Sequence, residues 1–272
     1  MLTRIISALV ALPGALYLIY LGGWPFAGLL LAVVIICAHE LASMTVPGDR
    51  GHAALVVVLS VLMLLAAQTG HLVTPAGFAI GSCAVVLVLL FFLFRLRSIE
   101  TSAARMGYVF LGLAWAGLLC SAVAVLRLLP EGASWVLQAC VLSWGSDTGA
   151  YFAGRFLGKK KLYEQVSPKK TWAGAIGGVF SATLMALGFQ HFFGPTNLSM
   201  VELTVVGAVA SILGQTGDLC ESLLKRSVGV KDSGKIMPGH GGLLDRIDAL
   251  LFVSPFLLAY AVVVRGLPLT WL

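Results

Sequence analysis

The stretch from Ala76 to Phe94 reads AGFAIGSCAVVLVLLFFLF and contains no charged residue. A helix needs roughly 17–25 apolar residues to cross the hydrocarbon core of a bilayer, which is about 30 Å thick. The whole chain is 59% hydrophobic and 11% charged, whereas roughly a quarter of the residues in soluble domains are charged. We therefore expect lipid, rather than a large internal core, to be the main apolar solvent of the folded chain.

Similar apolar runs recur from Ile5 to the C-terminal region, separated by Gly, Pro and charged residues. These breaks divide the chain into about nine expected helical spans. The spans are 5–21, 24–45, 53–70, 76–94, 107–129, 134–154, 172–192, 200–225 and 246–264. The pattern predicts an all-α, polytopic integral membrane protein.

The positions of Lys and Arg predict the orientation, because cytoplasmic loops carry an excess of these residues. If the N-terminus is cytoplasmic, all of the 18 Lys and Arg residues except Arg127 and Arg265 fall on the cytoplasmic side. We expect N-terminal helices over 1–130 and a catalytic region over 131–272, with cytoplasmic loops at 155–171 and 227–245. The basic residues lie in short loops rather than along a soluble face, which argues against a nucleic-acid partner.

A stretch rich in ionisable residues and glycine runs from Gly217 to Asp248 and reads GDLCESLLKRSVGVKDSGKIMPGHGGLLDRID. On a helix, its residues Asp218, Glu221, Ser222 and Lys225 would share one face. Charged groups at membrane depth cost about 2.5–3.5 kcal/mol each, so they are seldom present without a partner or a task. Snorkelling to the headgroups explains Lys225 but not the short Asp218 side chain.

The same stretch contains a glycine-rich loop before the last span. Gly241 and Gly242 would let backbone N–H groups approach a phosphate closely, with a helix N-terminus beyond them, although a tight turn is the simpler alternative. Asp245 and Asp248 would share one helix face and suit a hard cation such as Mg²⁺. The alternative is that they only stabilise the helix dipole, by about 0.3–1 kcal/mol each.

Further polar residues interrupt two other spans. Asp147 lies near the expected cytoplasmic end of one span and is a candidate metal ligand. The run Lys159–Lys161 is better explained as a topology signal or a headgroup contact. His39 and Glu40 are better explained as structural hydrogen-bonding residues than as substrate ligands.

Three motifs carry a resemblance to a known family. The run from Ser222 through Lys231-Asp232 and His240-Gly241-Gly242 to Asp245-Arg246-Ile247-Asp248 closely resembles the signature of the phosphatidate cytidylyltransferase, or CDP-diacylglycerol synthase, family. Segments 146–151 and 167–171 also look like family motifs, and Met237 is a mild departure. The resemblance is sharp over residues 143–248.

The resemblance implies roles for individual residues. Mg²⁺, with a second cation left open, would be held by Asp147, Asp218, Asp245 and Asp248. The catalytic group would be Asp218, Lys225, Arg226, Lys231, His240, Asp245 and Arg246. The substrate-binding group would be Ser143, Lys169, Lys170, Thr171, Ser222, Asp232, Gly241 and Gly242.

The implied reaction joins CTP to phosphatidic acid and gives CDP-diacylglycerol and pyrophosphate in phospholipid biosynthesis. The expected partners are these two substrates and membrane lipids, and a homodimer is left open. The expected location is the bacterial inner membrane, with the site on the cytoplasmic side. Alternatives are a CTP-dependent polyprenol kinase, another lipid-phosphate transferase such as a CDP-alcohol phosphotransferase, a transporter, and a non-catalytic scaffold. The transporter fits least well because the acids crowd one half of the chain.

Overall fold

The computed structural model describes the chain except for residues 1, 96, 194–197, 237–240 and 271–272. Helices dominate the described residues, and the polypeptide forms two compact units. Within a bilayer each backbone N–H and C=O must find a partner inside the protein, and a helix satisfies this requirement within one segment. The expected all-α polytopic fold is confirmed.

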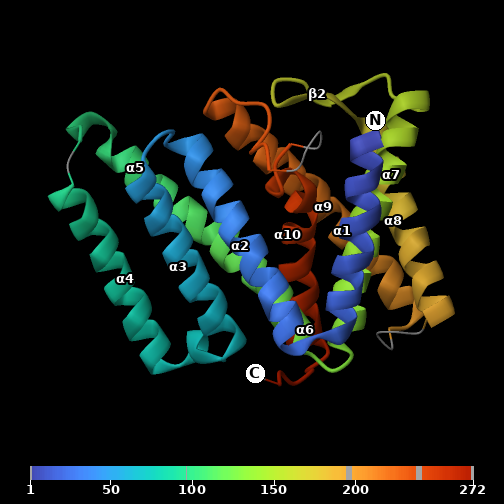
Figure 1. Cartoon of the computed structure of the whole chain (residues 1–272). Coiled ribbons are helices and arrows are strands. Elements are labelled where there is room, and N and C mark those ends of the chain that lie inside the picture. Colours follow the sequence, from blue (N-terminus) through green and yellow to red (C-terminus); the bar gives the residue numbers. More distant parts are fainter. Residues whose placement is uncertain (1, 96, 194–197, 237–240, 271–272) are drawn as a thin grey trace. The chain divides into compact units, whose positions relative to one another are not determined.

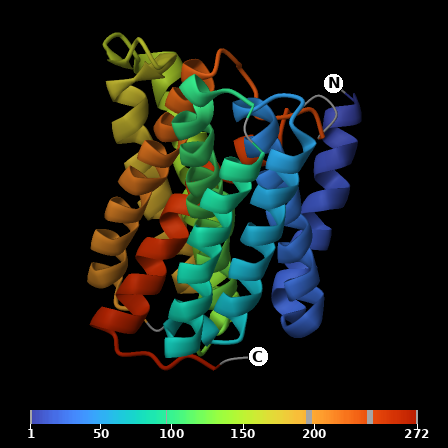
Figure 2. The same cartoon turned by 90° about the vertical axis from the view of Figure 1, so that its left-hand side faces the viewer.

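The first unit comprises Met1–Leu128, Asp232–Leu244 and Thr270–Leu272. Its helices α2, α3 and α4 lie side by side in both views (Figures 1 and 2). The elements of this unit are α1 (Leu2–Leu21), α2 (Gly23–Thr45), α3 (Arg50–Gln68), the 3₁₀ turn η1 (His71–Val73), α4 (Pro75–Phe94), α5 (Ile99–Gly112), the π-helical stretch η2 (Leu113–Leu119) and α6 (Cys120–Arg127). Segment Asp232–Leu244 groups with these helices, although it lies within the region expected to form the catalytic half.

The second unit comprises Leu129–Lys231 and Asp245–Leu269. Helices α7, α8 and α9 pack together in it. Its elements are α7 (Gly132–Leu157), strands β1 (Lys161–Tyr163) and β2 (Ser167–Thr171), α8 (Trp172–Phe193), α9 (Met200–Ser227), α10 (Leu244–Ala259) and the π-helical stretch η3 (Tyr260–Val264). The first residue of α10, Leu244, is assigned to the first unit, and the rest of the helix belongs to the second.

Every expected span coincides with a helix. Among the residues that the structure describes, seven helical segments are long and apolar enough to cross a membrane, and α7 is not one of them. Helix α4 illustrates the lipid-facing pattern, because it buries only Val88 and Phe92 and leaves Phe78 78% and Leu93 66% exposed. Such apolar surface is stable against hydrocarbon and would be unfavourable in water. The number of crossings and the side of the N-terminus stay predictions.

The polar connection after α7 contains a structure that the sequence analysis did not predict. Strands β1 and β2 form an antiparallel hairpin, with Lys161 opposite Thr171 and Tyr163 opposite Ser167. The hairpin extends beyond the ends of α7 and α8 in both views (Figures 1 and 2). The Lys161 ammonium donates to the Pro168 carbonyl over 2.6 Å, which fixes this lysine within the hairpin.

Small residues allow α7 and α8 to pack closely. A Cβ atom added at Gly177 of α8 would overlap the Cβ of Ala153 in α7 and would lie 3.2 Å from the Gly149 carbonyl. A Cβ added at Gly149 would in turn overlap the Ser181 side chain. Close contact between small residues is a common way to associate helices in membranes, where the hydrophobic effect does not drive helices together. This contact sets the positions of the polar residues at the end of α7 and in the hairpin.

We predict that two Gly→Ala changes in α8 affect the melting temperature differently. Gly177→Ala should lower the melting temperature in detergent, since overpacking costs about 1–3 kcal/mol. Gly188→Ala should leave it unchanged or raise it, because open space surrounds Gly188 and alanine favours a helix by about 0.8–1 kcal/mol. Equal melting temperatures for the two variants would contradict the close α7–α8 contact.

Candidate active site

A pocket of about 500 Å³ lies in the second unit, where the hairpin meets the ends of three helices. Five of the predicted site residues line it, namely Asp147, Lys169, Lys170, Thr171 and Asp218. The other lining residues are Ala150, Tyr151, Gly154, Arg155, Leu162, Gly174, Ala175 and Gln215. The wall is therefore rich in charge, although the helices that form it are mostly apolar.

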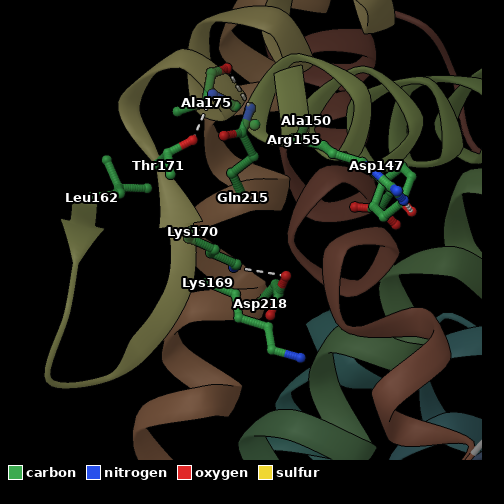
Figure 3. A pocket seen from close by; sticks show the side chains of 13 residues that line it. Asp147, Ala150, Arg155, Leu162, Lys169, Lys170, Thr171, Ala175, Gln215 and Asp218 are labelled. Atoms are coloured by element: carbon green, nitrogen blue, oxygen red, sulfur yellow. Dashed lines mark hydrogen bonds and ion pairs between the residues drawn. The ribbon is translucent and has the colours of Figure 1, made fainter. Parts of the chain in front are cut away.

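An ion pair joins the hairpin to α9 across this pocket. The Lys170 ammonium lies 2.7 Å from an Asp218 carboxylate oxygen (Figure 3). The Lys170 side chain is 24% exposed and that of Asp218 is 33% exposed, whereas the Lys170 ammonium nitrogen itself is buried against its partner. The Ser222 hydroxyl donates to the other Asp218 oxygen over 3.4 Å, one helical turn further along α9.

The start of α8 is fixed by the last residue of the hairpin. The Thr171 hydroxyl accepts a hydrogen bond from the Gly174 N–H over 3.1 Å, which satisfies one of the free donors in the first turn of α8. The Gln215 amide of α9 donates to the Ala175 carbonyl over 3.1 Å (Figure 3). These two bonds hold β2, α8 and α9 around the pocket, so Lys170 leaves the hairpin at a defined position.

A second ionic cluster links α9 to α10. The Lys225 ammonium lies 2.5 Å from Asp245 and 3.2 Å from Glu221. The Glu221 side chain is fully buried, and Lys225 is only 10% exposed. Breaking a buried ion pair leaves an uncompensated charge and typically costs about 3–5 kcal/mol. Lys225 therefore serves first to neutralise the two carboxylates.

Glycines bring α10 close to α9 beside these acids. A Cβ atom at Gly217 would lie 2.6 Å from the Phe252 ring and 3.0 Å from the Asp248 carbonyl. A Cβ at Gly214 would lie 3.1 Å from the Val253 side chain. The absence of side chains at these glycines therefore places Asp248 next to the turn of α9 that carries Asp218.

The carboxylates of three helices interact electrostatically in this unit. Asp147 of α7 and Asp248 of α10 each experience the negative charge of Asp218, and Asp248 also experiences that of Asp147. The cations Lys170 and Arg246 act on Asp147 in the opposite sense. The described residues contain no group of three or more His, Cys, Asp or Glu side chains already arranged around a metal position. However, Mg²⁺ usually takes only one or two carboxylates together with substrate phosphates and water, and the oxygen donors here are of that kind.

The glycine-rich loop lies in the first unit, where Glu40 of α2 organises it. The Glu40 carboxylate accepts hydrogen bonds from the Leu243 and Leu244 N–H groups, each over 3.0 Å, and from the Ser233 hydroxyl over 3.3 Å. Glu40 is 2% exposed. Because Leu244 is the first residue of α10, Glu40 caps that helix from a position about 200 residues earlier in the chain.

Glycine is required where the loop crosses this carboxylate. A Cβ atom at Gly234 would overlap the Glu40 side chain, and one at Gly242 would overlap the Ser233 hydroxyl and lie 2.7 Å from Glu40. The structure confirms the structural hydrogen-bonding role expected for Glu40. His39 does not share it, since its ring lies 3.4 Å from the Ser43 hydroxyl instead.

Other predicted site residues lie away from the pocket wall or have other partners. Ser143 is buried in α7 and does not line the pocket. The Arg226 guanidinium donates to the Val230 carbonyl at the end of α9. Lys231, Asp232 and Arg246 are exposed, and Gly241 has a positive φ of 84°. His240 lies outside the described residues.

Three residues with clear structural roles were not among the predicted site residues. Glu221 shares the polar face of α9 with Asp218, so the helical spacing could have selected it. Gln215, one turn before Asp218, was detectable as an isolated amide in an apolar helix. In the sequence analysis Arg155 is only one of the basic residues that predict the orientation in the membrane. In the structure it lines the pocket, and its guanidinium donates to the Tyr151 hydroxyl over 2.8 Å.

Comparison with known proteins gives a consistent result. The profile of a family described as the cytidylyltransferase family matches residues 2–264. A phosphatidate cytidylyltransferase of Bacillus subtilis (strain 168) is 34% identical over 256 residues, which cover 93% of this chain and 95% of that protein.

Two staphylococcal proteins are similar over a shorter region. The phosphatidate cytidylyltransferase of Staphylococcus aureus (strain COL) is 46% identical over 127 residues, or 47% of this chain and 48% of that protein. The protein of the same name from Staphylococcus haemolyticus (strain JCSC1435) is 47% identical over 127 residues, with the same coverage. The identity over this half of the chain exceeds that of the full-length match.

We predict that Glu40→Gln loosens the start of α10. A glutamine side chain keeps one acceptor oxygen but turns an NH₂ group toward a backbone N–H, and an unsatisfied buried donor costs about 1–3 kcal/mol. Hydrogen–deuterium exchange at the Leu243 and Leu244 amides should therefore accelerate roughly tenfold. His39→Gln, at the exposed neighbouring position, is the control and should leave the exchange unchanged. Equal exchange in both variants would contradict the capping role.

Proposed function

This chain belongs to the cytidylyltransferase family, and we propose that it condenses CTP with phosphatidic acid to form CDP-diacylglycerol and pyrophosphate. The full-length similarity to a phosphatidate cytidylyltransferase supports this substrate pair. The proposal also accounts for an ionic pocket in a chain built from apolar helices, because one substrate is a membrane lipid and the other a soluble nucleotide.

The ion pair between Lys170 and Asp218 is the structural observation that supports the proposal most directly. Both proposed substrates are phosphate anions, so their site needs cations that can turn toward them. Lys169, Lys170 and Arg155 line the pocket and supply positive charge. Positioning and electrostatic stabilisation provide most of the catalysis in phosphoryl transfer, and nucleotidyl transfer has similar needs.

The proposed reaction is a single displacement at phosphorus. A phosphate oxygen of phosphatidic acid forms a bond to the α-phosphorus of CTP, while the bond from that phosphorus to the oxygen bridging to the β-phosphorus breaks. The leaving pyrophosphate keeps the electron pair of that bond. In this scheme Lys169 and Lys170 bind phosphate oxygens, and Lys225 fixes both Asp245 at the start of α10 and Glu221 in α9.

The carboxylates would hold the metal. We assign Asp218, Asp147, Asp248 and Asp245 as candidate ligands of Mg²⁺, and the mutual repulsion among the first three is a reason for a cation to bind there. When bound, Mg²⁺ supplies positive charge that neutralises phosphate oxygens and orients them. The Lys170 ammonium, which pairs with Asp218, would bind a phosphate oxygen of the substrates.

The location follows from the same substrates. The excess of Lys and Arg on alternate loops supports a cytoplasmic position for the hairpin and for the glycine-rich loop. We propose the bacterial inner membrane, with the pocket facing the cytoplasm where CTP is available. The lipid substrate would enter from the adjacent leaflet.

The fate of the CTP phosphates should separate this proposal from a lipid kinase. With purified protein, phosphatidic acid and Mg²⁺ in detergent micelles, α-labelled CTP should transfer its label to the lipid phase and release pyrophosphate. γ-Labelled CTP should leave the lipid unlabelled. A γ-labelled lipid with release of CDP would show that the chain is a CTP-dependent kinase instead.

A second test addresses the carboxylate. Asp218→Asn should reduce kcat roughly 10²–10³-fold, as is typical when one preorganised electrostatic group is lost. It should also raise the Mg²⁺ concentration needed for half-maximal rate, because an amide oxygen binds hard cations more weakly than a carboxylate. Glu164→Gln, in the exposed turn of the hairpin that carries Lys170, is the control and should behave like the original protein. Near-normal turnover by a folded Asp218→Asn variant would remove Asp218 from the mechanism.

A further inference from the structure

A buried carboxylate in the first unit collects three arginines. Asp49 precedes α3, and its side chain is 1% exposed. One of its oxygens accepts hydrogen bonds from the Gly51 and His52 N–H groups, each over 3.1 Å, and thereby caps α3. Burial alone would raise the pKa of Asp49, but the His52 N–H and the Arg95 ion pair outweigh it and lower the pKa to about 2. Asp49 is therefore negatively charged at neutral pH.

Arg95 and Arg97 lie in the connection between α4 and α5, and Arg105 lies in the second turn of α5. The Arg95 guanidinium lies 2.6 Å from one Asp49 oxygen, the Arg105 guanidinium contacts the other, and the Arg97 Nε lies 3.7 Å from it. We call Asp49, Arg95, Arg97 and Arg105 the arginine cluster. Its four side chains carry three positive charges and one negative charge, so the arginine cluster has a net charge of about +2.

Two of these guanidinium groups are fixed by their surroundings. Arg95 lies over the Phe91 ring at 5.3 Å from its centroid, and Arg105 lies over the Phe92 ring at 5.8 Å. The Arg95 guanidinium also lies directly against the backbone of Gly51, where a Cβ atom would overlap it. Aromatic faces attract such cations and limit their motion. The cluster is therefore preorganised rather than a set of mobile surface side chains.

The arginine cluster retains unused donors. The Arg105 Nε is buried and has no hydrogen-bond partner among the described residues. Arg95 is 37% exposed and Arg97 is 54% exposed, so both can reach a ligand from outside the unit. A buried donor without a partner, next to an excess of positive charge, calls for an acceptor such as a bound anion.

We propose that the arginine cluster binds a phosphomonoester anion, which is a second phosphate site in addition to the pocket. A phosphomonoester carries about −1.5 to −2 charges at pH 7, which matches the excess of the cluster. Guanidinium groups bind phosphate oxygens in pairs of parallel hydrogen bonds. The cluster lies where α3 begins and α4 ends, at the boundary of apolar helices, so a lipid headgroup can reach it as well as free phosphate.

Ordinary interfacial arginines provide the simpler alternative. Arginine commonly extends to the headgroups without binding any one lipid, and such arginines need neither a shared carboxylate nor aromatic supports. The neighbouring Arg50 is of that type, since it is exposed at the start of α3 and forms no ion pair with any residue that the structure describes. Arg50 therefore provides a matched control for the loss of one interfacial charge.

The experiment compares Arg97→Gln with Arg50→Gln in the full chain in detergent. Arg97 is suitable because it is the most exposed of the three arginines, so Asp49 keeps two partners when it is replaced. Binding is measured by native mass spectrometry and by the shift in melting temperature on titration with short-chain phosphatidic acid, phosphatidylcholine or inorganic phosphate. Unchanged melting temperatures without any ligand will show that both variants are folded.

We expect the original protein to bind phosphatidic acid at two sites, and Arg97→Gln to weaken one of them at least fivefold. Arg50→Gln should change neither by more than twofold, and phosphatidylcholine should not compete. Saturable binding of inorganic phosphate that depends on Arg97 would identify a site open to water. Its absence, with lipid binding retained, would identify a headgroup site.

Two results would overturn the proposal. One is equal weakening by Arg97→Gln and Arg50→Gln, which would mean that only general surface charge matters. The other is the absence of any Arg97-dependent binding of either phosphate probe to the original protein. Neither result depends on turnover, so the proposed reaction can fail while the arginine cluster stands, or the reverse.

Discussion

A charge held among apolar helices must have a counter-charge or hydrogen-bond donors, because lipid provides neither. Four acids meet this requirement in different ways. Glu40 is neutralised by backbone N–H groups, Asp49 by arginines, Asp218 by Lys170 from a hairpin, and Asp245 by Lys225 from a neighbouring helix. These contacts are made at helix ends and connections, and they determine where the connections lie. The polar part of the fold is therefore determined largely by the need to satisfy a few carboxylates.

The same requirement explains why structure and chemistry coincide in the second unit. Lys170 can neutralise Asp218 only if the hairpin lies against α9, and in this position the hairpin forms one wall of the pocket. Thr171 and Gln215 then fix that arrangement through the first turn of α8.

The sequence was sufficient to predict the helical spans and much of the pocket, for identifiable physical reasons. Hydropathy indicates the length of a membrane span directly. The helical spacing of the polar residues in α9 predicts that they share one face, and the Ser222–Asp218 and Lys225–Glu221 contacts confirm this prediction. The hairpin was not predicted because strands of three and five residues are too short to show a clear alternation of apolar and polar residues. The hydrogen-bond partners of Glu40 could not be predicted either, because hydropathy does not indicate which distant loop donates hydrogen bonds to a buried carboxylate. The metal ligands stay predictions.

The cap that Glu40 places on α10 has a consequence for biosynthesis. During translation α2 emerges early, whereas its partners Ser233, Leu243 and Leu244 are made roughly 200 residues later. At a synthesis rate of about 5–20 residues per second, the glutamate must wait tens of seconds inside a nascent bundle without its donors. The N-terminal helices are thus committed to the membrane before they are complete, and a fragment ending near residue 130 would keep an uncompensated acid in its interior. The first unit is completed only when nearly the whole chain has been made.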